Sequence, residues 1–126
     1  MIDDYTVTTE KNFEKAVSSV LEAIKKRGLR ILHTHDIGGM LTSTGFSVDP
    51  LKIVEFCSEE FARELLRTDV KMSLMMPCKI SIYVKDGKTY ISTLRPRAIG
   101  DFYSGLMQVA EQEDSLNLSI VEEAKG

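Results

Sequence analysis

The sequence contains only two cysteines, Cys57 and Cys78, and they lack the Cys-x-x-Cys spacing of redox and zinc motifs. Two cysteines are too few for the disulfide framework that stabilises small secreted domains. We interpret them as buried thiols, a redox pair or ligands. Because a disulfide depends on the Cα–Cα distance in the fold, the separation in sequence leaves these alternatives open.

An excess of positive charge and long apolar runs are also lacking. The formal net charge is −3, so we expect no broad positively charged surface that would attract phosphate groups. A nucleic-acid partner is therefore not expected. No run approaches the roughly 18 apolar residues of a membrane span. The first residues, MIDDYTVTTEK, are acidic and polar where a signal peptide is basic and then apolar. We therefore expect a soluble, cytoplasmic protein.

Complete catalytic motifs are absent as well. Gly38 and Gly39 form a pair, but neither Gly-x-Gly-x-x-Gly nor Gly-Lys-Ser/Thr is present, so a turn into a short helix is favoured over a phosphate loop. No arrangement of Ser, His and Asp typical of a catalytic triad can be recognised, and the acidic residues are scattered along the sequence and not paired. The sequence favours a protein that is not an enzyme. An enzyme that uses His33, His35 or Asp36 is the alternative.

The clearest element present is a β-hairpin from Met75 to Pro96. Asp86-Gly87 is typical of two-residue turns with positive φ, and alternating side chains flank it. Cys78 falls in phase with the apolar face, so its sulfur is expected at the edge of the core, and Pro77 marks the start of the strand. The predicted cross-strand pairs are Lys85 with Lys88, Ile82 with Ile91, and Tyr83 with Tyr90. The apolar face is Ile80, Ile82, Val84 and Ile91, and the polar face is Lys79, Ser81, Tyr83, Tyr90 and Ser92.

The hydrophobic periodicity of the rest of the chain is consistent with a single domain over residues 1–126. They predict strands over residues 5–9, 29–36 and 51–56, a helix over 13–28 with a cap at Asn12 or Thr9 and a stop at Gly28, a short helix over 37–44, and a helix after Ser58. The order is strand, helix, strand, short helix, strand, helix, strand, strand, helix. We therefore expect an α+β fold with a mainly antiparallel sheet and helices packed on it.

The last helix is expected over about residues 102–123. Its apolar positions are Phe102, Leu106, Val109, Ala110, Leu116 and Ile120. Glu113 interrupts this stripe, and Gly105 weakens the first turns. Such a stripe is expected to cover either the remaining face of the sheet or another subunit.

Two histidines lie in the predicted strand over residues 29–36. The alternation places His33 and His35 on one face with Leu29 and Ile31. Imidazoles in phase on a strand can bind a metal, but no third ligand follows at a recognisable spacing. Two partly exposed histidines near a strand end are the favoured interpretation.

Cys57 lies just before a predicted helix that Ser58 is expected to cap. The N–H groups of a helix N-terminus favour a thiolate, whereas the negative charges of Glu59 and Glu60 oppose it. The two effects are of similar size. A reactive thiol therefore does not follow from position alone.

The residues around both cysteines resemble a known family. Cys57-Ser58-Glu59-Glu60-Phe61-Ala62, followed by Met72-Ser73-Leu74-Met75-Met76-Pro77-Cys78 and an alternating strand, is similar to the Cys-Asn-Pro … Gly-Leu-Leu-Leu-Pro-Cys pattern of domain-of-unknown-function family 302. Upstream, the helix from Phe13 to Gly28, the strand from Leu29 to Leu32 and Asp36 also fit, so the resemblance covers about residues 5–96. Ser58-Glu59 departs from Asn-Pro, Ser73 from a glycine, and Arg95 from an aspartate.

The resemblance implies a small α+β domain, often dimeric, with no established biochemical function. It also implies that the two cysteines lie close together at the ends of strands. We therefore expect a homodimer, and the candidate binding residues are Cys57, Ser58, Pro77, Cys78 and Asp36.

Two function classes follow from these observations. The favoured class is a non-enzymatic module that binds a ligand or itself, without a cofactor. The alternative is thiol chemistry, in which Cys57 and Cys78, with Met75 or Met76, bind Cu(I) or zinc or carry a sulfur or redox equivalent; His33 and His35 are further candidate metal ligands. Against the alternative, methionines beside a strand more often fill a core, and free cysteines are often buried.

Overall fold

The computed structural model describes residues 2–126 and contains one five-stranded sheet in the order β1-β5-β4-β3-β2. Every neighbouring pair of strands is antiparallel. The strands are β1 (Asp4–Thr9), β2 (Arg30–His35), β3 (Leu51–Cys57), β4 (Cys78–Lys85) and β5 (Lys88–Leu94). The helices are α1 (Phe13–Lys26), α2 (Ile37–Ser43), α3 (Glu59–Thr68), α4 (Ile99–Phe102) and α5 (Met107–Lys125), with 3₁₀ helices η1 (Val70–Met75), η2 (Pro96–Ala98) and η3 (Ser104–Leu106). The α+β class is confirmed.

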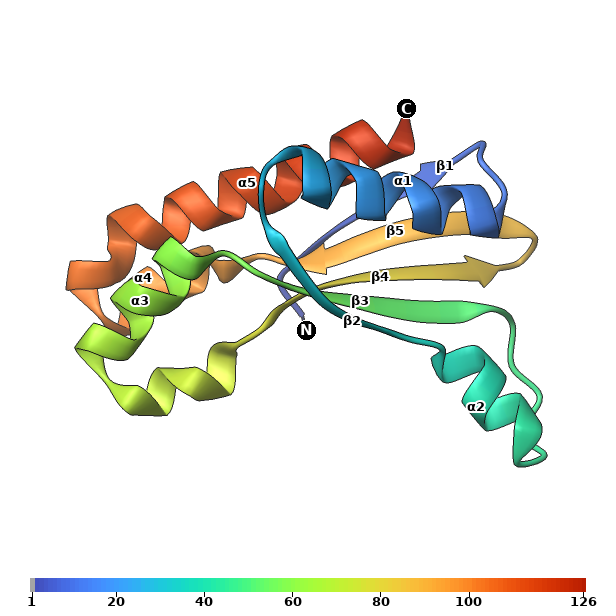
Figure 1. Ribbon diagram of the computed structural model, residues 1–126, viewed down its shortest axis with the longest axis horizontal. Helices are drawn as coiled ribbons and strands as arrows, with labels where there is room; N and C mark the ends of the chain where they lie inside the picture. Colours follow the sequence, from blue (N-terminus) through green and yellow to red (C-terminus); the bar gives the residue numbers. More distant parts are fainter. Residues whose placement is uncertain (1) are drawn as a thin grey trace.

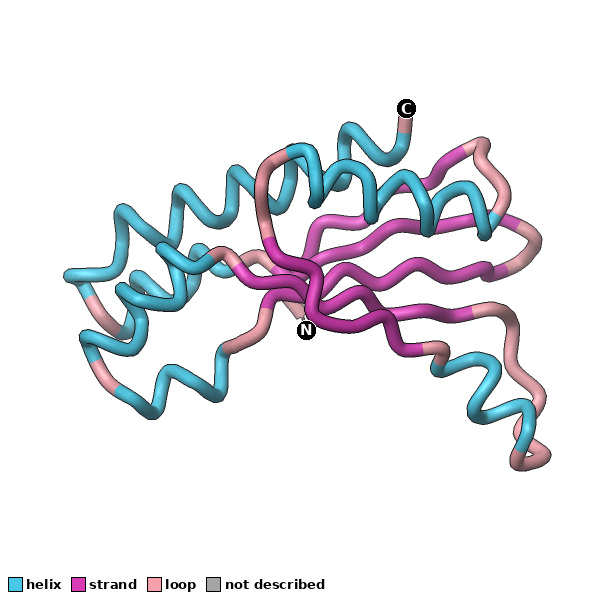
Figure 2. The backbone as a smooth tube through the Cα atoms, viewed as in Figure 1, coloured by secondary structure: helices cyan, strands magenta, loops and turns pink. Residues whose placement is uncertain are grey.

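The long helices α1 and α5 lie side by side on one face of the sheet (Figure 1). Figure 2 shows α3, η1 and α4 gathered beyond one end of the strands, and α2 beyond the other. The main core lies between α1, α5 and the sheet, and its largest buried side chains include Ile24, Phe56, Ile80, Ile82, Ile91 and Ile120. A second buried cluster, which includes Phe61, Leu65, Met72, Ile99 and Leu106, lies at the α3 end.

The predicted hairpin is confirmed with its register. Asp86 has φ 52° and Gly87 φ 76°, the left-handed pair that a two-residue turn of this kind requires. Lys85 pairs with Lys88 across the turn. On the face away from the long helices, Tyr83 and Tyr90 stack with ring centroids 5.2 Å apart. Cys78 contacts both buried clusters, so its predicted place at the edge of the core is correct.

The two helices before β3 are capped by side chains. The Lys15 amide donates to Asn12 Oδ1 at 2.8 Å, and Gly28, with φ 71°, follows the C-terminus of α1. The Gly39 amide donates to Asp36 Oδ1 at 2.9 Å at the start of α2. Asp36 is therefore the N-cap of α2, which gives this candidate binding residue a structural role.

The predicted alternation of the second strand is wrong after Ile31. A register shift between Ile31 and His33 places Ile31 opposite the buried Phe56, but His33 opposite Glu55. The extra residue, Leu32, is half exposed. Because a bulge inserts one residue, it moves both histidines to the face opposite that of Ile31.

The predicted start of the last helix is also wrong. The chain from Ile99 to Leu106 forms two short helical turns, and α5 begins at Met107. Phe102 is 83% exposed and does not belong to the buried stripe. A glycine in the first turns, Gly105, weakens a continuous helix here.

The apolar stripe of α5 covers the sheet and α1. Ile120, Val121 and Ala124 are part of the main core, so this apolar face of α5 is buried within a single chain. The homodimer stays a prediction that no longer rests on this helix. Within residues 2–126, no helix combines the length and the apolar character needed to cross a bilayer.

Candidate functional site

The ends of β3 and β4 bring the two cysteines to one place. Cys57 is the last residue of β3 and Cys78 the first of β4, where Cys78 pairs with Phe56, the neighbour of Cys57. Both thiols are free and half-buried. Both line a cavity of about 310 Å³, here called the small hollow, together with Ser58 and Pro77. Four of the five predicted binding residues therefore share one site. Asp36 does not, because it follows the C-terminal end of β2, whereas Cys57 pairs with Arg30 at the N-terminal end.

The Cys78 thiol is held in its neutral form. Its pKa is raised to about 12, chiefly by burial and also by the nearby Glu113 and Cys57, against the opposing effect of a hydrogen bond with Asn117. A thiol with this pKa carries almost no thiolate at neutral pH, so Cys78 is a poor nucleophile.

Ser58 occupies the N-cap position of α3 without capping it. Its side chain makes no hydrogen bond to the first turn of the helix. Instead it hydrogen-bonds the Glu113 carboxyl of α5. The predicted position of the cap is correct, but the hydroxyl is used for a contact between two helices that are distant in sequence.

Glu113 and Asn117 are the site residues that sequence reasoning missed. They lie one turn apart on α5, and each is only 3% exposed. Glu113 Oε2 and Asn117 Oδ1 are buried and have no hydrogen-bond partner among residues 2–126. The available signal was an acidic residue that interrupts an apolar stripe, followed four residues later by an amide.

Burial of the Glu113 carboxyl changes its acidity. Removal from water raises its pKa to about 7, and the hydrogen bond with Ser58 opposes this shift only in part. Near neutral pH the carboxyl is therefore close to the midpoint of its titration. Groups with such shifted pKa values cluster at functional sites.

A larger cavity of about 450 Å³, here called the large hollow, adjoins the same cluster. Cys78 and Asn117 both line it, together with Phe61 and Thr93. Four apolar residues that line it are exposed to solvent, namely Ile2, Leu74, Met75 and Leu94. The predicted metal candidate Met75 is thus one of the residues at its rim.

Phe61 separates the cavities. Its ring is 4% exposed, and it lines the large hollow, the small hollow and a third cavity of about 120 Å³, here called the side hollow. Glu113 and Ser58 line the side hollow. One aromatic side chain from α3 therefore lies between all three spaces.

The model of the family described as "Domain of unknown function DUF302" matches residues 5–121. The chain belongs to the DUF302 family. The match includes α5 as far as Val121, and so covers Glu113 and Asn117, whereas the resemblance in the sequence extended only to about residue 96.

A solved structure supports the fold of this DUF302 domain. It is a crystal structure of an uncharacterized conserved DUF302 protein from Bacillus stearothermophilus, with a TM-score of 0.89 and 20% sequence identity over 98% of this chain and 99% of that chain. Identity at this level establishes the shared fold alone. Among curated proteins, none matches the chain.

Arg95, a departure from the DUF302 pattern, forms an ion pair beside the large hollow. Its Nη2 and Nε lie 2.8 and 3.2 Å from the two carboxylate oxygens of Asp114, a buried residue of α5. Because the guanidinium donates two hydrogen bonds to one carboxylate, its orientation is fixed. In this DUF302 domain the residue before Pro96 therefore fastens the end of β5 to α5.

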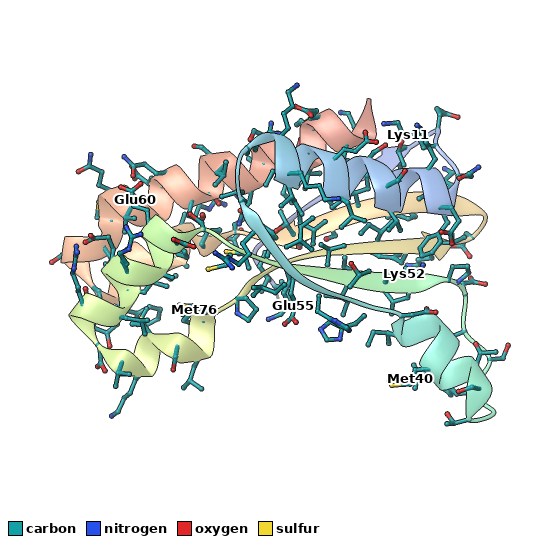
Figure 3. All side chains as sticks on the ribbon, viewed as in Figure 1. Lys11, Met40, Lys52, Glu55, Glu60 and Met76 are labelled. Atoms are coloured by element: carbon teal, nitrogen blue, oxygen red, sulfur yellow. The ribbon has the colours of Figure 1, made fainter. Side chains whose placement is uncertain are left out.

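The predicted histidine pair lies apart from the linings of the hollows in this DUF302 domain. The rings of His33 and His35 are 4.5 Å apart, and His35 Nε2 lies 2.6 Å from Glu55 Oε1. Figure 3 shows Glu55 on the side of the sheet away from α1 and α5, and Met76 where the chain enters β4. Neither histidine lines the large or small hollow. Within the described chain, no three or more His, Cys, Asp or Glu side chains form a group able to hold a metal ion.

Proposed function

We propose that this DUF302 domain is a binding module that holds a small apolar molecule in the large hollow. The observation that carries the proposal is the exposed apolar rim, formed by Ile2, Leu74, Met75 and Leu94 around one cavity. Contiguous exposed apolar patches on soluble proteins commonly mark ligand or partner sites.

The chemistry of the cavity suits this occupant. Small-molecule sites are mainly apolar, with a few polar groups that fix orientation. Here the apolar wall includes Phe61, Pro77 and Ile99, and the buried polar groups are the Asn117 amide and the Thr93 hydroxyl. Each Å² of apolar surface removed from water contributes about 25 cal/mol. Covering the exposed rim therefore supplies a driving force for binding.

A charge at the rim is expected to weaken binding selectively. The probe is the neutral apolar fluorophore N-phenyl-1-naphthylamine, whose emission rises in an apolar site. Leu74→Glu places a carboxylate on an exposed rim residue, so we expect at least a tenfold increase in Kd, about 1.4 kcal/mol. The measurement is a fluorescence titration of each variant.

Val70→Glu is the matched control for this experiment. Val70 belongs to the same 3₁₀ helix as Leu74, is similarly exposed at 72% against 86%, and lines neither the large nor the small hollow. The control is expected to bind like the wild type. Equal effects of the two substitutions, or no saturable binding by the wild type, would refute the proposal.

Thiol chemistry is the second candidate function, because Cys57 and Cys78 line one cavity. The reaction that fits is exchange with a small disulfide. The Cys57 thiolate forms a mixed disulfide and expels one thiolate; Cys78 then loses its proton to water, attacks the Cys57 sulfur as a thiolate and expels the second thiolate. The protein is oxidised by two electrons and the reagent is reduced to two thiols. The same sulfurs are the candidate ligands for Cu(I) or zinc.

The raised pKa of Cys78 leads to a clear expectation for thiol labelling. With 5,5′-dithiobis(2-nitrobenzoate) at pH 7.5, we expect one fast equivalent of released thiolate from the native wild type, lost in Cys57→Ser and kept in Cys78→Ser. A second equivalent released at the same rate, with an internal disulfide found by mass spectrometry, would favour the thiol function. A rise in melting temperature with Cu(I) or zinc that needs both cysteines would favour the metal-binding form.

A further inference from the structure

We propose that the ligand of this site is a primary aliphatic amine, whose apolar chain fills the large hollow and whose ammonium group hydrogen-bonds Asn117 Oδ1, one helical turn from the charge of the Glu113 carboxylate. The proposal rests on the proposed function, since it names the chemical class that the binding module accepts.

The buried acceptors of α5 require a hydrogen-bond donor. A buried polar atom without a partner costs free energy, and native proteins seldom leave two such atoms on adjacent turns of one helix. Asn117 lines the large hollow, and Glu113 lines the adjoining side hollow. Asn117 Oδ1 is an acceptor, and so is Glu113 Oε2 when the carboxyl is charged, so an occupant that satisfies Asn117 beside a charged Glu113 must bring hydrogen-bond donors. An ammonium group brings three and accepts none.

The charges around these acceptors favour a cation over an anion. The groups that face Glu113 are Ser58 and Cys78, and Glu60 of α3 shares the side hollow with it. No lysine or arginine from the described chain lines the side hollow or the small hollow. The large hollow has Lys79 and Arg95, and Arg95 is already paired with Asp114. The charges at the side hollow are therefore acidic, and Lys79 at the large hollow is the charge that opposes a bound cation.

The protonation of Glu113 gives the proposal a pH dependence. The carboxyl is mostly neutral below its pKa of about 7 and mostly charged above it. A bound ammonium favours the charged form and lowers this pKa, so affinity for an amine must rise as pH increases from 6 to 8. Affinity for a neutral alcohol of the same length has no such requirement. The other titratable groups near Glu113 are Cys78 and Glu60.

The test compares three probes that share one alkyl chain. Octylamine, octan-1-ol and octanoate each compete with N-phenyl-1-naphthylamine in fluorescence titrations at pH 6 and pH 8. At pH 8 we expect octylamine to displace the fluorophore at a concentration at least tenfold lower than octan-1-ol, with octanoate the weakest. At pH 6 the preference for the amine is expected to fall severalfold.

Glu113→Gln supplies the decisive comparison, and Glu111→Gln its control. The glutamine side chain keeps the shape of the glutamate but not its charge, so the preference for octylamine over octan-1-ol should fall to within about threefold at both pH values. Glu111 is an exposed residue of the same helix, and its replacement should leave the preference unchanged.

The outcomes separate this inference from the proposed function. If octylamine binds no better than octan-1-ol while the fluorophore and the alcohol bind, the amine class is wrong and the binding module stands. If neither the fluorophore nor any chain binds, the proposed function fails and this inference fails with it. An amine preference that survives Glu113→Gln also overturns the assignment, because the charge is then supplied from elsewhere.

Discussion

Replacing Phe61 with alanine is expected to lower the free energy of unfolding by about 3–5 kcal/mol, the usual cost of removing a buried aromatic ring. Phe61 is buried in the second cluster and lies between the three hollows. The substitution therefore removes packing and also joins the hollows into one larger cavity. Urea unfolding followed by circular dichroism measures the loss.

Ligand binding separates the two effects of this substitution. Because the joined cavity is larger, octylamine at saturating concentration is expected to recover part of the lost stability in Phe61→Ala. Phe56→Ala is the matched control, since Phe56 is equally buried in the main core and lines none of the three hollows. It should lose similar stability and gain nothing extra from the amine. Phe61→Leu and Phe56→Leu provide the same comparison with smaller losses if an alanine variant fails to fold.

Glu113→Gln is expected to stabilise the protein at pH 8 by up to about 3 kcal/mol, from a shift of roughly 2.5 pKa units at 1.36 kcal/mol each. The pKa of the carboxyl rises from 4.5 to about 7 on folding. The folded state thus favours the protonated form. Stability from this group is fully present below pH 4.5 and is lost as pH rises through 7. The charge at pH 8 therefore opposes folding, and glutamine removes it.

The measurement is the difference in unfolding free energy between wild type and variant at several pH values. We expect a difference near zero at pH 4.5 that grows to its full size by pH 8. Glu111→Gln, on the exposed side of α5, should show no such growth. A Glu113→Gln difference that is constant with pH would mean that folding does not raise the pKa of the Glu113 carboxyl.

Local chemistry was sufficient to predict the hairpin. The Asp86-Gly87 turn fixes its own geometry, and once that register is set, alternation places Ile82 and Ile91 on the same buried face. The caps at Asn12 and Asp36 belong to the same class of signal, in which a side chain bonds a backbone amide three residues ahead. Only the role of Asp36 changed, from candidate ligand to cap.

Features that depend on distant contacts were not predictable in this way. The bulge at Leu32 leaves no mark in an alternating strand, because one inserted residue changes the face of the histidines without changing their spacing. Serine is a typical N-cap residue, but the hydroxyl of Ser58 has a competing partner in Glu113 of α5, more than fifty residues later in the sequence. Both outcomes are decided by packing between elements that are remote in sequence.

Only part of the candidate site could be predicted from the sequence. The cysteines and their neighbours were found through the family resemblance, since their spacing alone leaves proximity open. Glu113 was noticed as an interruption of an apolar stripe, which is equally typical of a solvent-exposed acid. Its burial follows from the short turns between Ile99 and Leu106, which set where α5 begins and which face it presents to α3.

The ionisation of the Glu113 carboxyl in solution tests the central claim most directly. In protein labelled with ¹³C at the glutamate side-chain carboxyl, the Glu113 resonance, assigned by its loss in Glu113→Gln, is followed by NMR from pH 4 to pH 9. We predict a midpoint near pH 7 in the free protein and a lower midpoint when octylamine is present. A midpoint near 4.5 that octylamine does not move would contradict the claim.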